Sequence, residues 1–131
     1  MSVVITNPPG LHDPTSFGYS HAVSAPGEIV HIAGQYGSDA TGGVVSPDFA
    51  AQAKRAFENL GVALETVGLG FADVVRLGTY LVDHDPGKLE VLVGLIREHW
   101  GDRPPAQTLI GVAALAFPDM LFEVDAVAVR S

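Results

Sequence analysis

Residues 46–83, SPDFAAQAKRAFENLGVALETVGLGFADVVRLGTYLVD, place an amphipathic helix directly before a strand. In the first part, apolar residues recur at steps of three and four, the spacing that gathers them on one face of an α-helix. We expect Ser46 to be the N-cap and Pro47 the first helical residue, because proline loses no hydrogen bond there. Gly68 is the expected C-terminal cap, and Gly61 within the helix indicates a close packing contact, since glycine costs about 1 kcal/mol there. The apolar stripe consists of Phe49, Ala53, Ala56, Phe57, Leu60, Ala63, Leu64 and Val67.

A strand and a second helix follow. Residues 73–83 are rich in valine, leucine, threonine and tyrosine and lie between Gly70 and Pro86, which predicts a strand. The next helix is expected to have Asp85 as its N-cap, Pro86 in its first turn and Gly101 at its end. Its apolar stripe consists of Leu89, Leu92, Val93, Ile96 and Trp100.

The rest of the chain supplies four further strands. Residues 17–23 and 28–34 are short, apolar segments separated by SAPG, which predicts a hairpin. Two more strands are expected within 106–115 and 120–129. The order β-β-α-β-α-β-β predicts an α+β fold with both helices on one face of the sheet. Much of the opposite face is also apolar, so we expect further copies of the chain to cover it in a homo-oligomer.

Composition and charge exclude several classes of protein. The 131 residues are 47% hydrophobic and suit one domain spanning 1–131. The net charge of −8 and the scattered basic residues disfavour binding to nucleic acid or to an anionic membrane surface. There is no cysteine, and no apolar run approaches the roughly 18 residues of a membrane span. The N-terminus does not resemble a signal peptide, so a soluble, cytoplasmic protein is expected.

The polar residues offer few motifs. The five histidines have no metal-binding spacing, although His21 and His31 could face each other across the first hairpin, and we expect neither a metal nor a cofactor. Glu123 and Asp125 are two apart on a strand, so they project from one face at a separation of roughly 7 Å. Either this face is solvated or salt-bridged, or one carboxylate has a raised pKa and handles protons in a cleft.

Several segments together resemble one family. GYSHAV, AGQYG with TGGVV, QAKRAFENLGVALETVGLGFADVVRLGTYLVD, REHWGDRPPAQTLIGVAAL and FEVDAVAV occur in the order and spacing of the Rid family. These are the YjgF-like or RidA proteins, the reactive intermediate deaminases, and the resemblance begins at about Gly18. It implies a chorismate-mutase-like fold and a homotrimer with ligand clefts between subunits. In the deaminase branch, 2-imino or enamine acids are hydrolysed to 2-keto acids and ammonia.

The resemblance also implies roles for individual residues. Tyr19 matches the tyrosine that helps close the cleft, and Glu123 matches the glutamate that positions or activates water. Gly34 matches the glycine of a Gly-Gln pair, whereas Ala33 stands where serine is usual. Gln107 stands where the deaminases have an arginine that holds the substrate carboxylate. The implied ligand-binding residues are Tyr19, Ala33, Gly34, Gln107 and Thr108, with Glu123 as the catalytic residue.

The glutamine at position 107 changes the expected function. Hydrogen bonds to charged groups contribute roughly 1.5–3 kcal/mol each, so losing the guanidinium costs about one to two orders of magnitude per bond. We therefore expect an arginine-lacking branch that binds a neutral amide- or imine-like metabolite and, if it is an enzyme, hydrolyses a C–N bond as a hydrolase or deaminase. The alternatives are a non-enzymatic ligand-binding or chaperone-like trimer and, least favoured by the charge, an endoribonuclease.

Overall fold

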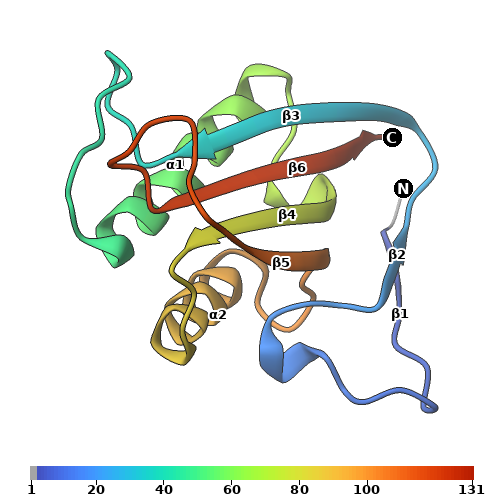
Figure 1. Cartoon of the computed structure of the whole chain (residues 1–131). Helices are drawn as coiled ribbons and strands as arrows, with labels where there is room; N and C mark the ends of the chain where they lie inside the picture. The colour runs from blue at the N-terminus through green and yellow to red at the C-terminus, as the bar shows by residue number, and fades with distance from the viewer. Residues whose placement is uncertain (1–2) are drawn as a thin grey trace.

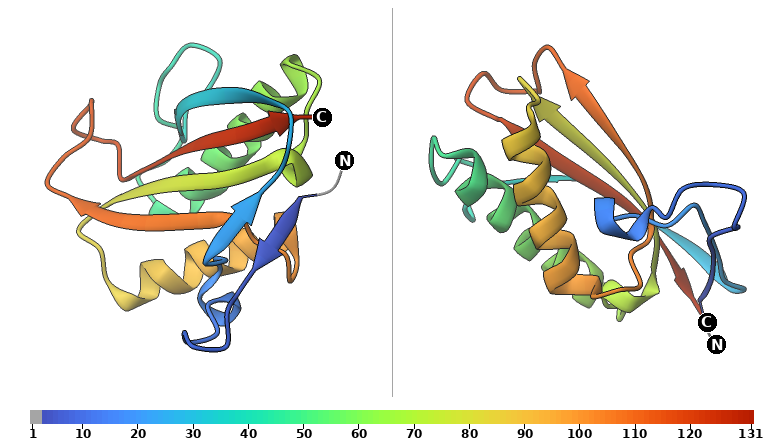
Figure 2. Two further views of the ribbon diagram at one scale, coloured as in Figure 1. Left: turned by 90° about the vertical axis from the view of Figure 1, so that its right-hand side faces the viewer. Right: turned by 90° about the horizontal axis from the view of Figure 1, so that it is seen from below.

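The computed structural model describes residues 3–131 and has two layers, a four-stranded mixed sheet and two helices across one of its faces (Figures 1 and 2). The strand order is β3-β6-β4-β5, with β4 and β5 parallel and the other pairs antiparallel. This confirms the predicted α+β fold. No helix within residues 3–131 is long and apolar enough to span a membrane. The elements are β3 (Glu28–Tyr36), α1 (Phe49–Thr66), β4 (Val74–Val82), α2 (Pro86–Trp100), β5 (Ala106–Val112) and β6 (Phe122–Arg130).

The start of α1 differs from the prediction by two residues. Asp48 is the N-cap, and its carboxylate accepts a hydrogen bond of 3.0 Å from the backbone N–H of Ala51. Ser46 instead accepts a bond of 3.0 Å from the N–H of Asp48, so it organises the turn before the helix. Pro47 therefore precedes the helix. Serine and aspartate are both good caps, and the sequence alone did not show which of the two would be used.

The other helix ends agree more closely with the sequence. Val67 is the C-cap of α1, and Gly68 follows it with φ of 76°, the left-handed conformation that glycine adopts without strain. Asp85 caps α2 by accepting a bond of 2.9 Å from the N–H of Lys88, and Gly101 closes the helix. The predicted limits of α2 are therefore confirmed.

The predicted N-terminal hairpin is wrong. β2 (Ala22–Ser24) pairs with β1 (Val4–Thr6) in a separate two-stranded sheet, whereas β3 pairs with β6. Gly27, with φ of 136°, turns the chain between β2 and β3 against the end of β6, where a Cβ would collide with the carbonyl of Arg130. The SAPG segment therefore carries the chain from one sheet to the other. His21 and His31 consequently do not face each other across a hairpin.

The core lies between the helices and the sheet. α1 and α2 lie across one face of the sheet (Figure 1), and the buried side chains of β4 and β6 pack beneath them. The predicted close contact at Gly61 is confirmed, since a Cβ there would lie 3.1 Å from the ring of Phe71. The fully buried side chains of this core include Phe57, Leu60, Leu64, Leu77, Leu81, Ile96, Phe122 and Val124.

The opposite face of the sheet is called the open face here, because neither helix covers it (Figure 2). It carries Ile29 and Ile110, which are 61% and 44% exposed. The registers place Arg76 and Tyr80 of β4 on this face with Glu123 and Asp125 of β6. The open face therefore combines exposed apolar side chains with a cluster of charged and hydroxyl groups.

Candidate functional site

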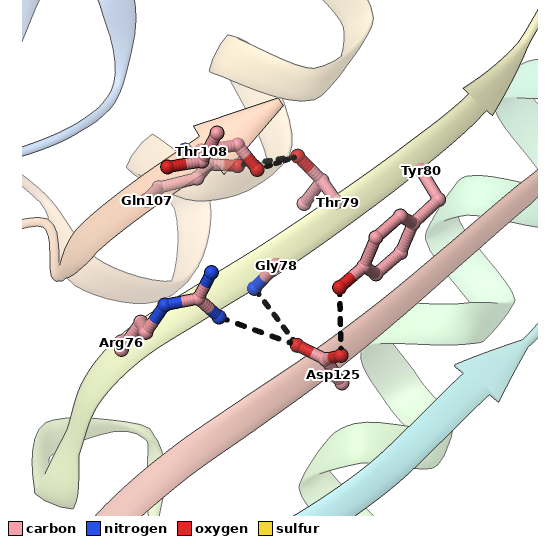
Figure 3. Close-up of polar contacts among 7 residues, drawn as sticks. All are labelled: Arg76, Gly78, Thr79, Tyr80, Gln107, Thr108 and Asp125. Atoms are coloured by element: carbon pink, nitrogen blue, oxygen red, sulfur yellow. Dashed lines mark hydrogen bonds and ion pairs between the residues drawn. The ribbon is translucent and has the colours of Figure 1, made fainter. Parts of the chain in front are cut away.

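Gln107 points from β5 towards the helix side of the sheet. It pairs in register with Leu77, which is fully buried in the core. The Gln107 Oε1 atom accepts a hydrogen bond of 3.0 Å from the Thr79 hydroxyl (Figure 3). Its Nε2 atom donates to the carbonyl of Gly18 at 3.1 Å. Because a carbonyl only accepts, Gly18 fixes which end of the amide is the nitrogen. The side chain is thus held from both ends.

A cavity of about 300 Å³ lies in front of this glutamine. α2 and β5 provide apolar walls, while Tyr19 and Gln107 provide polar groups. Thr108 also lines the cavity, although its register with Gly78 places its side chain on the open face. A small, largely apolar cavity with a few polar groups is the usual form of a ligand site. The structure thus brings together three of the predicted site residues. We call this space the Gln107 cavity; its lining consists of Phe17, Tyr19, Leu89, Leu92, Gln107, Thr108 and Leu109.

The other predicted residues gather around Glu123 on the open face. In β3, Ala33 and Gly34 lie between two register pairs and together oppose Asp125, which makes a β-bulge. A Cβ on Gly34 would lie 2.5 Å from Glu123 Oε2, closer than real side-chain carbons come to an oxygen. Gly34 therefore leaves the space that the Glu123 carboxylate occupies. Bulges of this kind are common beside active sites, where they redirect side chains.

Asp125 is held by three groups of β4. Its Oδ1 atom accepts a bond of 3.0 Å from the N–H of Gly78, and its Oδ2 atom accepts one of 2.9 Å from the Tyr80 hydroxyl (Figure 3). Arg76 lies 3.6 Å from the same carboxylate. The bond to Asp125 is also the main reason that the pKa of Tyr80 is raised, with burial adding to it. Two hydrogen bonds and an ion pair therefore fix the position of the Asp125 carboxylate.

Glu123 lies in a different environment from Asp125. Burial raises the pKa of the Glu123 carboxyl, and the negative charge of Asp125 raises it further. No hydrogen bond within residues 3–131 offsets these two effects. The salt bridge that the sequence offered as one interpretation lies at Asp125, and the raised pKa of the other interpretation lies at Glu123, whose handling of protons stays a prediction. Asp125 is the salt-bridged carboxylate, and Glu123 is the one suited to carry a proton.

The two groups of predicted residues lie on opposite faces of the sheet. Gln107 projects to the helix side with Leu77, whereas Glu123 projects to the open face because its neighbours Phe122 and Val124 are buried beneath the helices. The sheet therefore separates the Gln107 cavity from Glu123 within one chain. Sequence reasoning missed Thr79 and Tyr80 as partners, because its alternating pattern shows which residues share a face of one strand but not the pairing with neighbouring strands. Within residues 3–131, no three histidine, aspartate or glutamate side chains are placed to share a metal ion.

Comparison with known proteins identifies the family. The family model described as Endoribonuclease L-PSP matches residues 11–130. The chain belongs to this family, the Rid or YjgF-like proteins. A RutC family protein of Pyrococcus abyssi is 34% identical over 114 residues, which cover 86% of each chain. A human 2-iminobutanoate/2-iminopropanoate deaminase is 31% identical over 113 residues, covering 86% of this chain and 80% of that protein.

A solved structure supports the same assignment. The crystal structure of a Rid family protein from Yersinia pestis has a TM-score of 0.94 and 39% identity, and the match covers 99% of this chain and 100% of that one. The similarity extends over the sheet, both helices and the N-terminal strands. It is consistent with the chorismate-mutase-like fold that the sequence resemblance implied.

Proposed function

We propose that this Rid protein forms a homotrimer in which the Gln107 cavity of one copy faces Glu123 of a neighbour. Each cleft then binds a small, neutral, amide- or imine-like metabolite. The separation of the two residue groups by the sheet supports this arrangement, because one chain cannot bring Gln107 and Glu123 to the same small molecule. The uncovered Ile29 and Ile110 side chains supply an apolar surface for the contact between copies.

The bonding of Gln107 carries the assignment of a neutral ligand. A carboxamide has two N–H donors and two acceptor sites on its oxygen. Gly18 takes one donor and Thr79 occupies one acceptor site, so one of each remains. This remaining pair is complementary to a group that also donates and accepts, such as another amide. A carboxylate only accepts, so it would gain a single uncharged hydrogen bond and face the glutamine oxygen.

The chemistry that fits Glu123 is hydrolysis of a C=N or C–N bond. The carboxylate takes a proton from water as the water oxygen attacks the carbon, and the resulting carboxylic acid gives that proton to the nitrogen, which forms a carbinolamine from a C=N bond. A second transfer of the same kind, from the new hydroxyl through the carboxylate to the nitrogen, accompanies cleavage of the C–N bond. A carboxyl whose pKa is raised by burial suits both steps near neutral pH. The products are a carbonyl compound and ammonia or an amine. Asp125 lies beside it, held in place by Tyr80 and Gly78.

The second candidate is a trimer that binds the same ligand without turnover. The amide at Gln107 favours it, because a site without the guanidinium lacks the charge that binds a carboxylate substrate. RNA cleavage, which the family description suggests, is poorly supported by a net charge of −8. Absence of cleavage of single-stranded RNA at low salt would eliminate it.

The charge of the preferred ligand is tested with the isosteric pair propionamide and propionate, whose binding is measured by NMR chemical-shift changes. The native protein should bind propionamide more tightly. Gln107→Arg should reverse the preference by roughly ten- to a hundred-fold, and the isosteric Gln107→Glu should abolish propionate binding. Tighter binding of propionate by the native protein would refute the neutral-ligand assignment.

Turnover is tested with freshly generated 2-iminopropionate. We expect slow ammonia release by the native protein. Gln107→Arg should increase the rate of release, and adding Glu123→Ala to the Gln107→Arg protein should abolish it. Release at the rate of arginine-bearing relatives would show that Gln107 does not disable the reaction. If Gln107→Arg gains no activity while it gains propionate binding, the non-enzymatic alternative holds.

The shared cleft is tested by mixing two inactive variants. One combines Gln107→Arg with Glu123→Ala, and the other carries Gln107→Leu and keeps Glu123. After subunit exchange, mixed trimers contain clefts with the introduced arginine from one copy and an intact Glu123 from the other. Activity should therefore reappear on mixing. If the exchanged mixture stays inactive, both groups act within one chain and the proposed arrangement is wrong.

A further inference from the structure

The Tyr19 hydroxyl has a hydrogen-bond partner that lies outside the lining of the Gln107 cavity. His12 Nε2 is 2.7 Å from the Tyr19 hydroxyl oxygen. The two rings meet edge to face, with centroids 6.2 Å apart. His12 is in the exposed segment before β2, so its ring reaches the tyrosine from the solvent side of the chain. The contact joins a cavity residue to a group that can change its charge near neutral pH.

The other two tyrosines have partners of a different kind. Tyr36 donates to the carbonyl oxygen of Gly42 at 2.6 Å, and Tyr80 donates to the Asp125 carboxylate at 2.9 Å. Both partners only accept, so these two hydroxyls always donate their proton inward. The imidazole of His12 can either accept or donate at Nε2. Tyr19 is therefore the tyrosine whose hydrogen-bonding role depends on its partner.

His12 is itself held in place. Its backbone carbonyl accepts a bond of 2.9 Å from the ring of His21, and the N–H of His21 donates to the side chain of Asn7 at 2.7 Å. The rings of Phe17 and His21 meet the His12 ring edge to face at 6.0 and 5.0 Å. These contacts fix the imidazole in front of Tyr19, so the hydrogen bond does not depend on a freely rotating surface side chain.

The charged and titratable groups that face His12 are Asp13, His21 and Tyr19. Hydrogen bonds from Thr15 lower the pKa of the Asp13 carboxyl, with the charges of the two histidines adding to the effect. Asp13 therefore remains negative at neutral pH beside the two imidazoles.

We propose that His12 is a positioning residue that decides whether the Tyr19 hydroxyl donates to, or accepts from, a ligand in the Gln107 cavity. When Nε2 of neutral His12 carries no proton, it accepts the tyrosine proton and leaves the phenol oxygen as an acceptor for the ligand. When His12 is protonated, it donates to that oxygen, and the tyrosine proton turns to the ligand. The inference rests on the proposed function only in assuming that the cavity binds a ligand.

The first test needs no ligand. The protein is labelled with ¹³Cζ-tyrosine, and Tyr19→Phe identifies the Tyr19 signal. Between roughly pH 5 and 8, the range in which histidine titrates, the chemical shift of that signal should change in a step. His12→Gln should abolish the step, because its amide keeps a hydrogen bond but does not titrate. His21→Gln and the exposed control His84→Gln should leave it.

The result that overturns the proposal is a native Tyr19 signal without a step, or a step that persists in His12→Gln. Unchanged signals of Tyr36 and Tyr80 report that the variant is folded. In a second readout, the affinity for propionamide should change with pH in the native protein over the same range as the Tyr19 signal, and His12→Gln should remove that part of the change. His12→Phe should weaken binding about five-fold, the loss of one ordinary hydrogen bond, and His12→Gln should restore it. If propionamide does not bind at all, the proposed function fails, whereas the Tyr19 signal still decides the role of His12.

Discussion

The helix face and the open face of the sheet differ sharply although the same strands build both. Along β6, Phe122 and Val124 point into the core and are fully buried, while Glu123 and Asp125 alternate with them on the other side. The helix face is filled by apolar side chains with few polar exceptions. The open face holds two carboxylates and an arginine, and it also carries Ile29, which is 61% exposed.

The difference between the two faces separates the side chains that folding requires from those that it does not require. Burial of large apolar side chains stabilises the two layers, and this accounts for the helix face. It does not account for Glu123, whose charged form is disfavoured by burial and by its neighbour Asp125. A group kept at such a cost is a candidate for chemistry. The open face is therefore where we expect substitutions to change function and assembly rather than the fold.

The largest effect on stability is expected from the helix face. Phe57→Ala removes a fully buried ring that packs on Phe122 and Trp100, so it should lower the free energy of unfolding by about 3–5 kcal/mol. Ile110→Ala on the open face should cost less than about 1 kcal/mol in a monomer, because the side chain is 44% exposed. Urea unfolding followed by Trp100 fluorescence measures both. Equal losses would contradict the distinction between the faces.

The same contrast explains which parts of the fold the sequence predicted. The helix stripe of 46–68 and the strand at 73–83 have strong periodicity, and both are confirmed because burial against one core imposes that periodicity. The hairpin of 17–34 was wrong because SAPG resembles a hairpin turn, whereas Gly27 turns the chain past the end of β6. Pairing between distant strands is a tertiary property, so local turn signals did not identify the partner.

The candidate site was predicted in its parts but not in its arrangement. Alternation in β6 placed Glu123 and Asp125 on one face, as the structure confirms. Their different environments depend on Tyr80 and Gly78 of a strand more than forty positions away, as the separations of 45 and 47 residues show. The holding of Gln107 by Gly18 likewise joins distant segments. The sequence therefore showed which residue types the site contains, whereas the register of the strands determined which residues they contact.

Assembly through the open face gives the next largest effect. If copies of the chain cover Ile29, then Ile29→Asp buries a charge in each contact and should dissociate the trimer at micromolar concentration, since a buried isoleucine contributes about 1.5–3 kcal/mol. Val62→Asp is the matched control, because Val62 is 64% exposed on α1, on the other side of the molecule. Sedimentation velocity measures the mass of both variants. An Ile29→Asp protein that sediments like the native one would move the proposed contact away from this face.

Two glycines of the open face should respond differently to the same added methyl group. A Cβ on Gly78 would lie 2.5 Å from Asp125 Oδ1 and 2.6 Å from the Tyr80 hydroxyl, and these two groups are bonded to each other. Gly78→Ala should therefore cost about 1–3 kcal/mol of unfolding free energy. Gly34→Ala meets only the free end of Glu123, which can move, so it should cost less than about 1 kcal/mol while impairing catalysis by displacing the carboxylate.

Thermal unfolding and ammonia release in the Gln107→Arg background separate these outcomes. A Gly34→Ala protein with native stability and full activity would show that the position of Glu123 is not important. If Gly78→Ala is no less stable than Gly34→Ala, the Asp125 cluster is not rigid.

The smallest effect is the pH dependence of stability, and its sign should be opposite on the two faces. On the helix side, burial lowers the pKa of His99 below its ordinary 6.5, despite the opposing charges of Glu98 and Glu58. The unfolded chain then binds more protons as the pH falls below that value, so His99 makes the protein less stable towards acid. On the open face, the raised pKa of Glu123 means that the folded chain keeps its proton as the pH rises above the ordinary 4.5. Glu123 therefore lowers stability on raising the pH.

The two substitutions that remove these charges should consequently act in different pH ranges. His99→Gln should reduce the loss of stability between roughly pH 7 and 5, and Glu123→Gln should raise stability above about pH 5, each by less than about 0.5 kcal/mol after allowance for solvent exposure. Urea unfolding of both variants across this range provides the comparison. A gain from Glu123→Gln at neutral pH would show that the native carboxylate is kept at the expense of stability. If Glu123→Gln instead destabilises the protein at neutral pH, the carboxylate has a stabilising partner and the case for it as a proton carrier is lost.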